Sequence, residues 1–128
     1  MKILSVDDSK TVRQVIQNMA SVIAAEFLEA ENGVEALKVL ESCRGQVDLI
    51  ILDWEMPEMN GREFLTIIKK DERYCSIPVI MLTTVSQKDK VIDAVRAGAK
   101  QYITKPFSGE DLLTKIVHAL GIDSLDEL

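Results

Sequence analysis

The sequence has few cysteines, prolines and aromatic residues, and it has no long hydrophobic run. Its two cysteines, Cys43 and Cys75, stand far apart and in no zinc-type spacing, so they form neither a disulfide framework nor a thiolate zinc motif. No apolar stretch approaches the roughly 18 residues of a membrane span. Neither a long apolar segment nor a small-residue cleavage site follows Met1 and Lys2, so we expect no secretory signal. We therefore expect reduced thiols, a cytoplasmic location and no membrane partner.

Basic residues are also in the minority. The 128 residues include 15 Lys and Arg against 21 Asp and Glu, a formal net charge of −6. Proteins that bind nucleic acids or anionic membranes are normally basic, so this balance argues against both partners. A chain of this length forms one domain with a single core. We expect that domain to span residues 1–121, followed by a short acidic tail, Ile122–Leu128.

Short apolar runs alternate with longer amphipathic patterns along the whole chain. The expected strands are Lys2–Val6, Glu26–Ala30, Asp48–Leu52, Ile77–Leu82 and Ala99–Thr104. The expected helices run from Ser9 to Ala24, from Asn32 to Cys43, from Asn60 to Lys70, from Ser86 to Gly98 and from Ser108 to Gly121. Such alternation predicts βαβ units with helices on both faces of a parallel sheet. The expected fold is therefore α/β, a doubly wound five-stranded parallel sheet with five helices in three layers.

Four of the expected strands finish in polar residues that suit a phosphoryl group and a metal ion. The residues at these ends are Asp7 and Asp8, Asp53, Thr83, and Lys105. In an open parallel sheet the carboxyl ends of the strands line one edge, and ligands bind in the crevice there. We therefore expect these side chains to converge although they are far apart in the sequence.

Asp7, Asp8 and Asp53 would repel one another at such an edge. A pair of like charges about 4 Å apart costs on the order of 4 kcal/mol at an effective dielectric constant near 20. Such a cluster either raises carboxylate pKa values or recruits a cation, and Mg²⁺ suits carboxylates together with phosphate oxygens. Adjacent Asp residues are also common in solvated loops, so this reading stays open for Asp7 and Asp8 taken alone.

Lys105 favours the functional interpretation of the acidic cluster. This lysine precedes Pro106, whose stiff backbone fixes its direction. An ammonium group there neutralises a carboxylate at rest and binds a phosphoryl oxygen when one arrives. Thr83 adds a hydroxyl donor from the next strand, and Asp53 is the natural nucleophile for an acyl phosphate. Asp7 and Asp8 are left to hold the metal.

This ordered set resembles the receiver domains of two-component response regulators. The similarity covers essentially the whole chain and rests on Asp7-Asp8, Asp53, Thr83 and Lys105-Pro106-Phe107. The segment from Asp53 to Gly61, with the sequence DWEMPEMNG, is most similar to the single-domain chemotaxis regulators (CheY-like proteins). The resemblance implies a flavodoxin-like sheet with strand order 2-1-3-4-5.

The resemblance also implies a role for each residue of the site. Asp53 would accept a phosphoryl group from a sensor histidine kinase. Asp8, Asp53 and the backbone carbonyl of Glu55 would ligate Mg²⁺ directly, and Asp7 would act through a bound water. Thr83 and Lys105 would bind the phosphoryl oxygens, with a cis bond between Lys105 and Pro106. Tyr102 would be the switch aromatic that turns inward when Thr83 moves.

Such a chain would be a signalling switch and not an enzyme, since it catalyses only its own phosphorylation and dephosphorylation. Its expected partners are the chemotaxis kinase, a target such as the flagellar motor switch, and a phosphatase. Helix 86–98, strand 99–104 and helix 108–121 would form the docking face for the target.

Two positions depart from the closest chemotaxis pattern: Glu55 replaces a neutral residue and Val85 an acidic one. Both would flank the path of an attacking water, so we expect them to affect the lifetime of the phosphorylated state. We place Trp54, the only tryptophan, at the rim of the acidic pocket because it follows Asp53 directly.

Four other functions are alternatives to the switch. A phosphorelay intermediate would pass the phosphoryl group on to another histidine. A magnesium-dependent phosphohydrolase with an aspartyl nucleophile gains some support from Glu55, but the chain has no insertion to form a cap over a substrate. A pseudo-receiver scaffold would have lost residues such as Asp53 or Lys105, and both are present. A nucleotide or flavin carrier is disfavoured because no glycine-rich loop follows Val6.

Overall fold

The structure is a computed structural model, and it describes residues 1–56, 58–84 and 88–121. Within these ranges five strands alternate with five helices, as the sequence predicts. The strands are β1 (Lys2–Val6), β2 (Glu26–Ala30), β3 (Leu49–Asp53), β4 (Val79–Thr84) and β5 (Gln101–Lys105). The helices are α1 (Lys10–Val22), α2 (Gly33–Ser42), α3 (Gly61–Lys69), α4 (Lys88–Ala97) and α5 (Gly109–Leu120).

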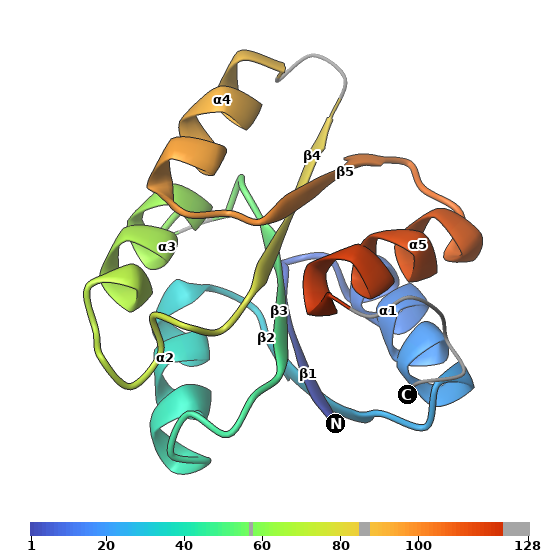
Figure 1. Ribbon diagram of the computed structural model, residues 1–128, viewed down its shortest axis with the longest axis horizontal. Helices are drawn as coiled ribbons and strands as arrows, with labels where there is room; N and C mark the ends of the chain where they lie inside the picture. Colours follow the sequence, from blue (N-terminus) through green and yellow to red (C-terminus); the bar gives the residue numbers. More distant parts are fainter. Residues whose placement is uncertain (57, 85–87, 122–128) are drawn as a thin grey trace.

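All four strand pairs are parallel, and the strand order is β2-β1-β3-β4-β5. Helices α1 and α5 cover one face of the sheet, and α2, α3 and α4 cover the other (Figure 1). The predicted fold class, strand order and three layers are therefore confirmed.

Each face of the sheet has its own apolar core, in place of the single core expected from the chain length, because successive strand residues point to opposite faces. Leu52 and Met81 pack with Phe64 and Leu65 on the α2–α4 side. Ile51 and Ile80 are also fully buried, on the α1–α5 side. Strand β3 is buried along its whole length, which is why it reads as an uninterrupted apolar run. This rigid centre carries Asp53 at its end.

Polar N-caps start most of the helices where the sequence predicts them. The side-chain oxygens of Ser9, Asn32, Asn60 and Ser108 each accept a backbone N–H from the first turn of the helix that follows. Asn60 forms a complete capping box with Glu63. The cap expected at Ser86 and the tail Ile122–Leu128 lie outside the described residues.

Strands β4 and β5 run closer to the site than the sequence predicts. The last predicted strand begins at Ala99, whereas β5 begins at Gln101 and includes Lys105. Strand β4 likewise continues to Thr84. The reason is that Thr83 pairs with Thr104 and Thr84 with Lys105, so the ladder continues through polar positions. Both Thr83 and Lys105 are thus held by the sheet and not by a loop.

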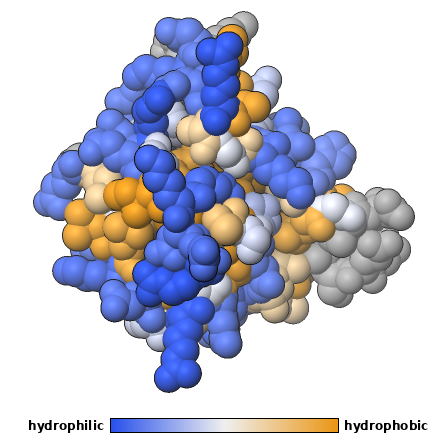
Figure 2. Space-filling model, turned by 60° about the vertical axis from the view of Figure 1, so that its left-hand side comes forward, coloured by the Kyte–Doolittle hydropathy of each residue, from blue (hydrophilic) through white to orange (hydrophobic). Residues whose placement is uncertain are grey.

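Hydrophilic side chains cover most of the face that Figure 2 brings forward, and hydrophobic residues gather there in smaller patches. In the described part of the chain, none of the helices is both long enough and apolar enough to cross a membrane.

Candidate functional site

The strand order brings the four polar strand ends to one edge of the sheet. Strands β1, β3, β4 and β5 are neighbours, and each is followed by or ends in a residue of the expected set. Within the register, Asp53 of β3 pairs with Leu82, the residue before Thr83. Topology alone therefore assembles a site from segments up to 98 residues apart, the separation between Asp7 and Lys105.

Three carboxylates meet at this edge. Asp7, Asp8 and Asp53 each offer an oxygen, and these oxygens all lie within 4.8 Å of one another. Asp7 is fully buried and Asp53 is 6% exposed, whereas Asp8 is open to solvent. The cluster is thus a pocket with a buried floor and one exposed carboxylate at its mouth.

Asp7 is fixed through both its backbone and its carboxylate. Its Oδ1 accepts the Ser9 backbone N–H at 2.8 Å, and its Oδ2 accepts from the Lys105 ammonium at 3.1 Å. Its own backbone N–H donates to the carbonyl of Ala30 at 3.0 Å. Both carboxylate oxygens are therefore already engaged by donors from the protein.

Arg13 of α1 is a part of this site that the sequence analysis missed. Its Nη1 donates to the Asp7 backbone carbonyl at 2.6 Å, and its Nε donates to Glu29 Oε1 at 2.7 Å. The side chain is only 7% exposed. The signal was present in the sequence, because Arg13 is in helical phase with the buried residues Ile16 and Ala20. A charged residue on an apolar helix stripe must find polar partners.

Lys105 connects two of the carboxylates. Its Nζ lies 3.1 Å from Asp7 Oδ2 and 3.4 Å from Asp53 Oδ1. The Lys105–Pro106 peptide bond is cis, as expected. One ammonium group therefore faces a cluster of three acids, which leaves an excess of negative charge.

Burial and this excess of negative charge both raise the pKa of Asp53. Burial is the largest influence and the Asp7 charge the second, and together they raise the pKa of Asp53 from 3.8 to about 7. The Lys105 ammonium and the Glu55 backbone N–H, 3.4 Å from Asp53 Oδ1, oppose this rise. A further cation in the pocket would favour the ionised carboxylate.

The donor set suits a hard divalent ion. Carboxylate oxygens from three residues stand within reach of one centre, and the surplus charge is negative. In the described residues no hydrogen bond engages the Asp8 carboxylate, so its oxygens are available as ligands. The residues therefore fit Mg²⁺.

Comparison with known proteins agrees with this geometry. The model of the response regulator receiver domain family matches residues 3–117. The chain belongs to that family. Chemotaxis protein CheY1 of Helicobacter pylori is 44% identical to this receiver over 122 residues, 94% of this chain and 98% of that protein. Receivers of the CheY type are signalling proteins of chemotaxis that take phosphoryl groups from histidine kinases and bind downstream targets.

Solved structures are similar as well. Chemotaxis response regulator CheY4 of Vibrio cholerae aligns with a TM-score of 0.85 at 34% identity, covering 93% of this chain and 98% of that one. The receiver domain of sensor histidine kinase PA1611 from Pseudomonas aeruginosa aligns with a TM-score of 0.82 at 25% identity, covering 94% and 97%. That structure has a magnesium ion coordinated in its active-site cleft.

The two residues expected to switch the receiver differ in exposure. Thr83, near the end of β4, is 3% exposed, and its Oγ1 donates to the Thr84 carbonyl oxygen at 3.4 Å. Tyr102 of β5 is 41% exposed, with Lys115 Nζ 5.1 Å from its ring centroid. The aromatic ring is therefore on the outside of the sheet edge, beside α5.

The interpretation of Trp54 as a rim residue is wrong. Its side chain is 5% exposed and belongs to the core on the α2–α4 side. Strand alternation explains this, because Trp54 follows the face of Leu52 and not that of Asp53. Gly61 packs against it so closely that a Cβ there would lie 2.8 Å from the Trp54 Cα.

Of the two departures from the chemotaxis pattern, only Glu55 lies in the described part of the chain. The Glu55 carboxylate forms an ion pair with Lys90 of α4, and both side chains are about half exposed. This pair links α4 to the loop after β3, beside Asp53. Val85 lies outside the described residues, so its expected role stays a prediction.

Proposed function

We propose that this receiver is a phosphorylation-controlled switch whose phosphoryl acceptor is Asp53. The supporting observation is the cluster of Asp7, Asp8 and Asp53, of which Asp7 and Asp53 are buried, with Lys105 in contact with these two. The upstream partner is a sensor histidine kinase. Asp53 attacks the phosphorus of a phosphohistidine, an O–P bond forms as the N–P bond breaks, and the released imidazole nitrogen keeps the electron pair and takes up a proton.

The protein groups around Asp53 have complementary tasks. Lys105, already 3.4 Å from Asp53 Oδ1, binds one phosphoryl oxygen, and the Thr83 hydroxyl binds another. Fixed donors of this kind stabilise charge that develops on the equatorial oxygens. The chain acts on its own carboxylate and not on a diffusible substrate, so it is a switch and not an enzyme.

Asp8, Asp53 and the backbone carbonyl of Glu55 are the proposed direct ligands of Mg²⁺. Asp7 acts at one remove, through a water, since Ser9 and Lys105 already donate to its two carboxylate oxygens. When bound, the ion neutralises charge on the phosphoryl oxygens and the acceptor.

The proposed output is protein binding at the face formed by α4, β5 and α5. Ile92 and Val95 of α4 are 59% and 54% exposed, and Tyr102 is 41% exposed beside Lys115. Exposed apolar and aromatic side chains together suit a protein partner. Phosphorylation draws Thr83 toward the phosphoryl group, Tyr102 turns inward, and the face changes shape. The flagellar motor switch is the proposed target, with a phosphatase as a further partner, in the cytoplasm.

A role as phosphorelay intermediate is the second candidate. The similar receiver domain of PA1611 comes from a sensor histidine kinase, so a chain of this fold serves within a kinase protein. In a relay the phosphoryl group of Asp53 would move on to a second histidine. Rapid loss of label to a histidine phosphotransfer protein, with no binding of a motor switch protein, would favour the relay.

Trp54 provides a test, because it is the only tryptophan, it follows Asp53 in the sequence and its side chain is buried. Its fluorescence is followed as Mg²⁺ is added and then carbamoyl phosphate. We expect one change with the metal and a second with the donor, and we expect Asp53→Asn to lose the second. A donor-dependent change that survives in Asp53→Asn would contradict Asp53 as acceptor.

A further inference from the structure

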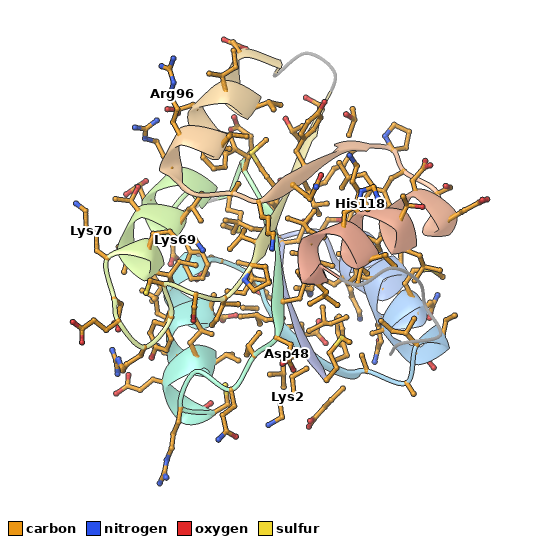
Figure 3. The ribbon with its side chains drawn as sticks, in the orientation of Figure 1. Lys2, Asp48, Lys69, Lys70, Arg96 and His118 are labelled. Carbon is orange, nitrogen blue, oxygen red and sulfur yellow. The ribbon has the colours of Figure 1, made fainter. Side chains whose placement is uncertain are left out.

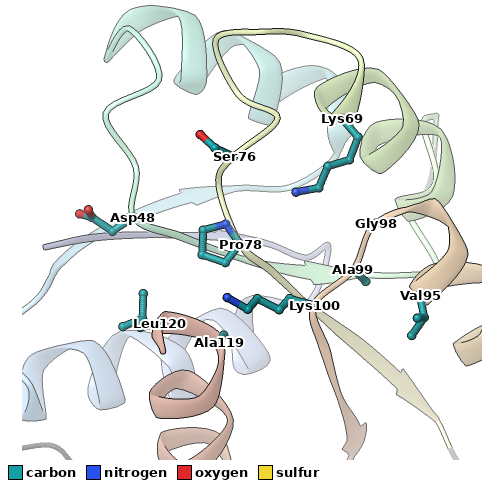
Figure 4. A pocket seen from close by; sticks show the side chains of 10 residues that line it. All are labelled: Asp48, Lys69, Ser76, Pro78, Val95, Gly98, Ala99, Lys100, Ala119 and Leu120. Carbon is teal, nitrogen blue, oxygen red and sulfur yellow. The ribbon is translucent and has the colours of Figure 1, made fainter. Parts of the chain in front are cut away.

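The amino edge of the sheet, opposite the acidic cluster, has a hollow of about 550 Å³ (Figure 4). Its walls come from the residue before β3, the end of α3, the loop before β4, the turn between α4 and β5, and the end of α5. Its volume is within the range of small-molecule sites, roughly 300–1,000 Å³. The proposed phosphorylation switch makes no use of it.

Lys69 is built into the wall of this hollow. Its Nζ donates to the backbone carbonyls of Cys75 at 3.1 Å and Ile77 at 2.9 Å. Its stem packs against Gly98, where a Cβ would lie 2.9 Å from the Lys69 Cγ, and Gly98 has a φ of +114°. An ammonium group has three N–H donors, so two carbonyls leave one donor and the full charge for a ligand.

Lys100 brings a second cation to the same hollow. Figure 4 shows both lysine side chains extending toward the side on which Pro78 lies. Burial, and to a lesser degree the charge of Lys100, lower the pKa of Lys69 although the Cys75 thiol acts in the opposite direction. In the described part of the chain, no ion pair joins either lysine to a carboxylate.

The rest of the lining restricts the kind of anion. Pro78 and Leu120 supply apolar surface beside the lysines, and Ser76 supplies a hydroxyl. Asp48 stands apart from the lysines in Figure 4 and accepts the Lys2 backbone N–H at 2.8 Å. A ligand with a second anionic group near Asp48 would be repelled by this carboxylate. The net charge of −6 disfavours large polyanions such as nucleic acids.

We propose that this hollow binds a small phosphate monoester, with the dianionic phosphate between Lys69 and Lys100 and the organic group on Pro78 and Leu120. Two ammonium groups match the two charges of a phosphate monoester, and lysine is a common phosphate ligand. Contact of the organic group with the apolar surface adds affinity, about 25 cal/mol per Å² removed from water. Inorganic phosphate lacks that contact and binds more weakly.

The test is an NMR titration of the ¹⁵N-labelled chain with phenyl phosphate, without magnesium. We expect saturable shifts at the amides of Ser76, Gly98 and Lys100. Lys100→Met is the main variant, because this side chain is exposed and its removal leaves the Lys69 contacts in place. Loss of one charge-assisted contact predicts roughly tenfold weaker binding.

Lys38→Met is the matched control, since it removes the same charge from an exposed position of α2. Its affinity for phenyl phosphate should equal that of the wild type. Equal weakening in both variants would overturn the site, because it would reduce the effect to net charge. Shifts centred on Asp53 and Lys105, equally tight binding of inorganic phosphate, or no saturation would overturn it too.

Discussion

At the carboxyl edge of the sheet three carboxylates lie together and one ammonium group contacts two of them, whereas at the amino edge two ammonium groups line one hollow. Strand β3 links the two edges: Asp48 precedes it and Asp53 ends it. Figure 3 shows Asp48 beside Lys2 at the amino end of this strand. The two carboxylates thus stand at opposite ends of one strand and differ in surroundings, since Asp48 is exposed and Asp53 is 6% exposed.

The two edges also assemble their charges differently. At the carboxyl edge each side chain stands at or just beyond a strand end, so the sheet positions them all. At the amino edge Lys69 comes from the end of α3 and is positioned by backbone carbonyls. Five residues of strand separate the edges by about 16 Å, more than the Debye length of about 8 Å at physiological salt. Substitutions at one edge should therefore leave the other unchanged.

The largest effect is expected for Mg²⁺ binding at the carboxyl edge. Asp8→Asn should weaken Mg²⁺ by roughly 10- to 100-fold, because it removes an exposed carboxylate that serves as a ligand. Titration of Trp54 fluorescence measures the affinity. Asp48→Asn makes the same chemical change at the amino edge and should leave the affinity as it is. Equal Mg²⁺ affinities in Asp8→Asn and Asp48→Asn would contradict the placement of the metal site at the carboxyl edge.

Next in size is the stability gained by removing a crowded acid. In the folded chain the pKa of Asp53 is raised from 3.8 to about 7, so between these pH values the folded state holds a proton that the unfolded state has lost. Stability therefore falls as the pH rises through that window. Without magnesium, Asp53→Asn should raise the free energy of unfolding by on the order of 1–3 kcal/mol at pH 8.

Urea denaturation measures this gain, which should shrink at pH 5, where the wild-type carboxyl is largely protonated. Asp48→Asn, at the exposed position just before the same strand, should show no comparable gain. A loss of stability in Asp53→Asn at pH 8 would show that the ion pair with Lys105 outweighs burial and repulsion.

At the amino edge the two lysines should differ in their contribution to stability. Lys69→Met leaves the Cys75 and Ile77 carbonyls without their donor and should cost about 1–3 kcal/mol. Lys100→Met should change stability by less than about 0.5 kcal/mol, since its side chain is exposed. Urea denaturation of both variants decides this, and equal losses would mean that Lys69 is not held as described.

The smallest effect is expected at Glu55. Glu55→Asn should change the rate at which the phosphorylated chain decays by less than about tenfold, in line with an exposed ion pair worth up to about 1 kcal/mol. Phosphorylation itself should persist. Lys90→Met is the companion variant, because it removes the ion-pair partner and leaves the Glu55 carboxylate in place. A decay rate unchanged by Glu55→Asn would mean that this side chain does not flank the water path.

Much of the carboxyl edge could be predicted from sequence because it depends on local patterns. Apolar runs define the strands, and the polar residue at each end then falls on a shared edge whatever the helices do. Trp54 was misplaced because adjacency in sequence to Asp53 suggested adjacency in space, whereas the pleat turns neighbours to opposite faces.

The remaining features depend on contacts that no local pattern encodes. The helical pattern shows that Arg13 needs polar partners but does not identify them, since the Asp7 carbonyl and Glu29 come from two different strand regions. Lys69 and Lys100 meet only once α3 and β5 have packed at the same end of the sheet. In the sequence, Lys69 at the end of α3 is most simply interpreted as a cation that interacts with the helix dipole.

The most direct test of the account is mass spectrometry of two variants that differ only in the edge they alter. Asp53→Asn and Asp48→Asn are each treated with carbamoyl phosphate and Mg²⁺ beside the wild-type chain. We predict a phosphoryl adduct of about 80 Da on the wild type and on Asp48→Asn, and none on Asp53→Asn. An adduct on Asp53→Asn, or none on the wild type, would contradict the assignment of Asp53 as the phosphoryl acceptor.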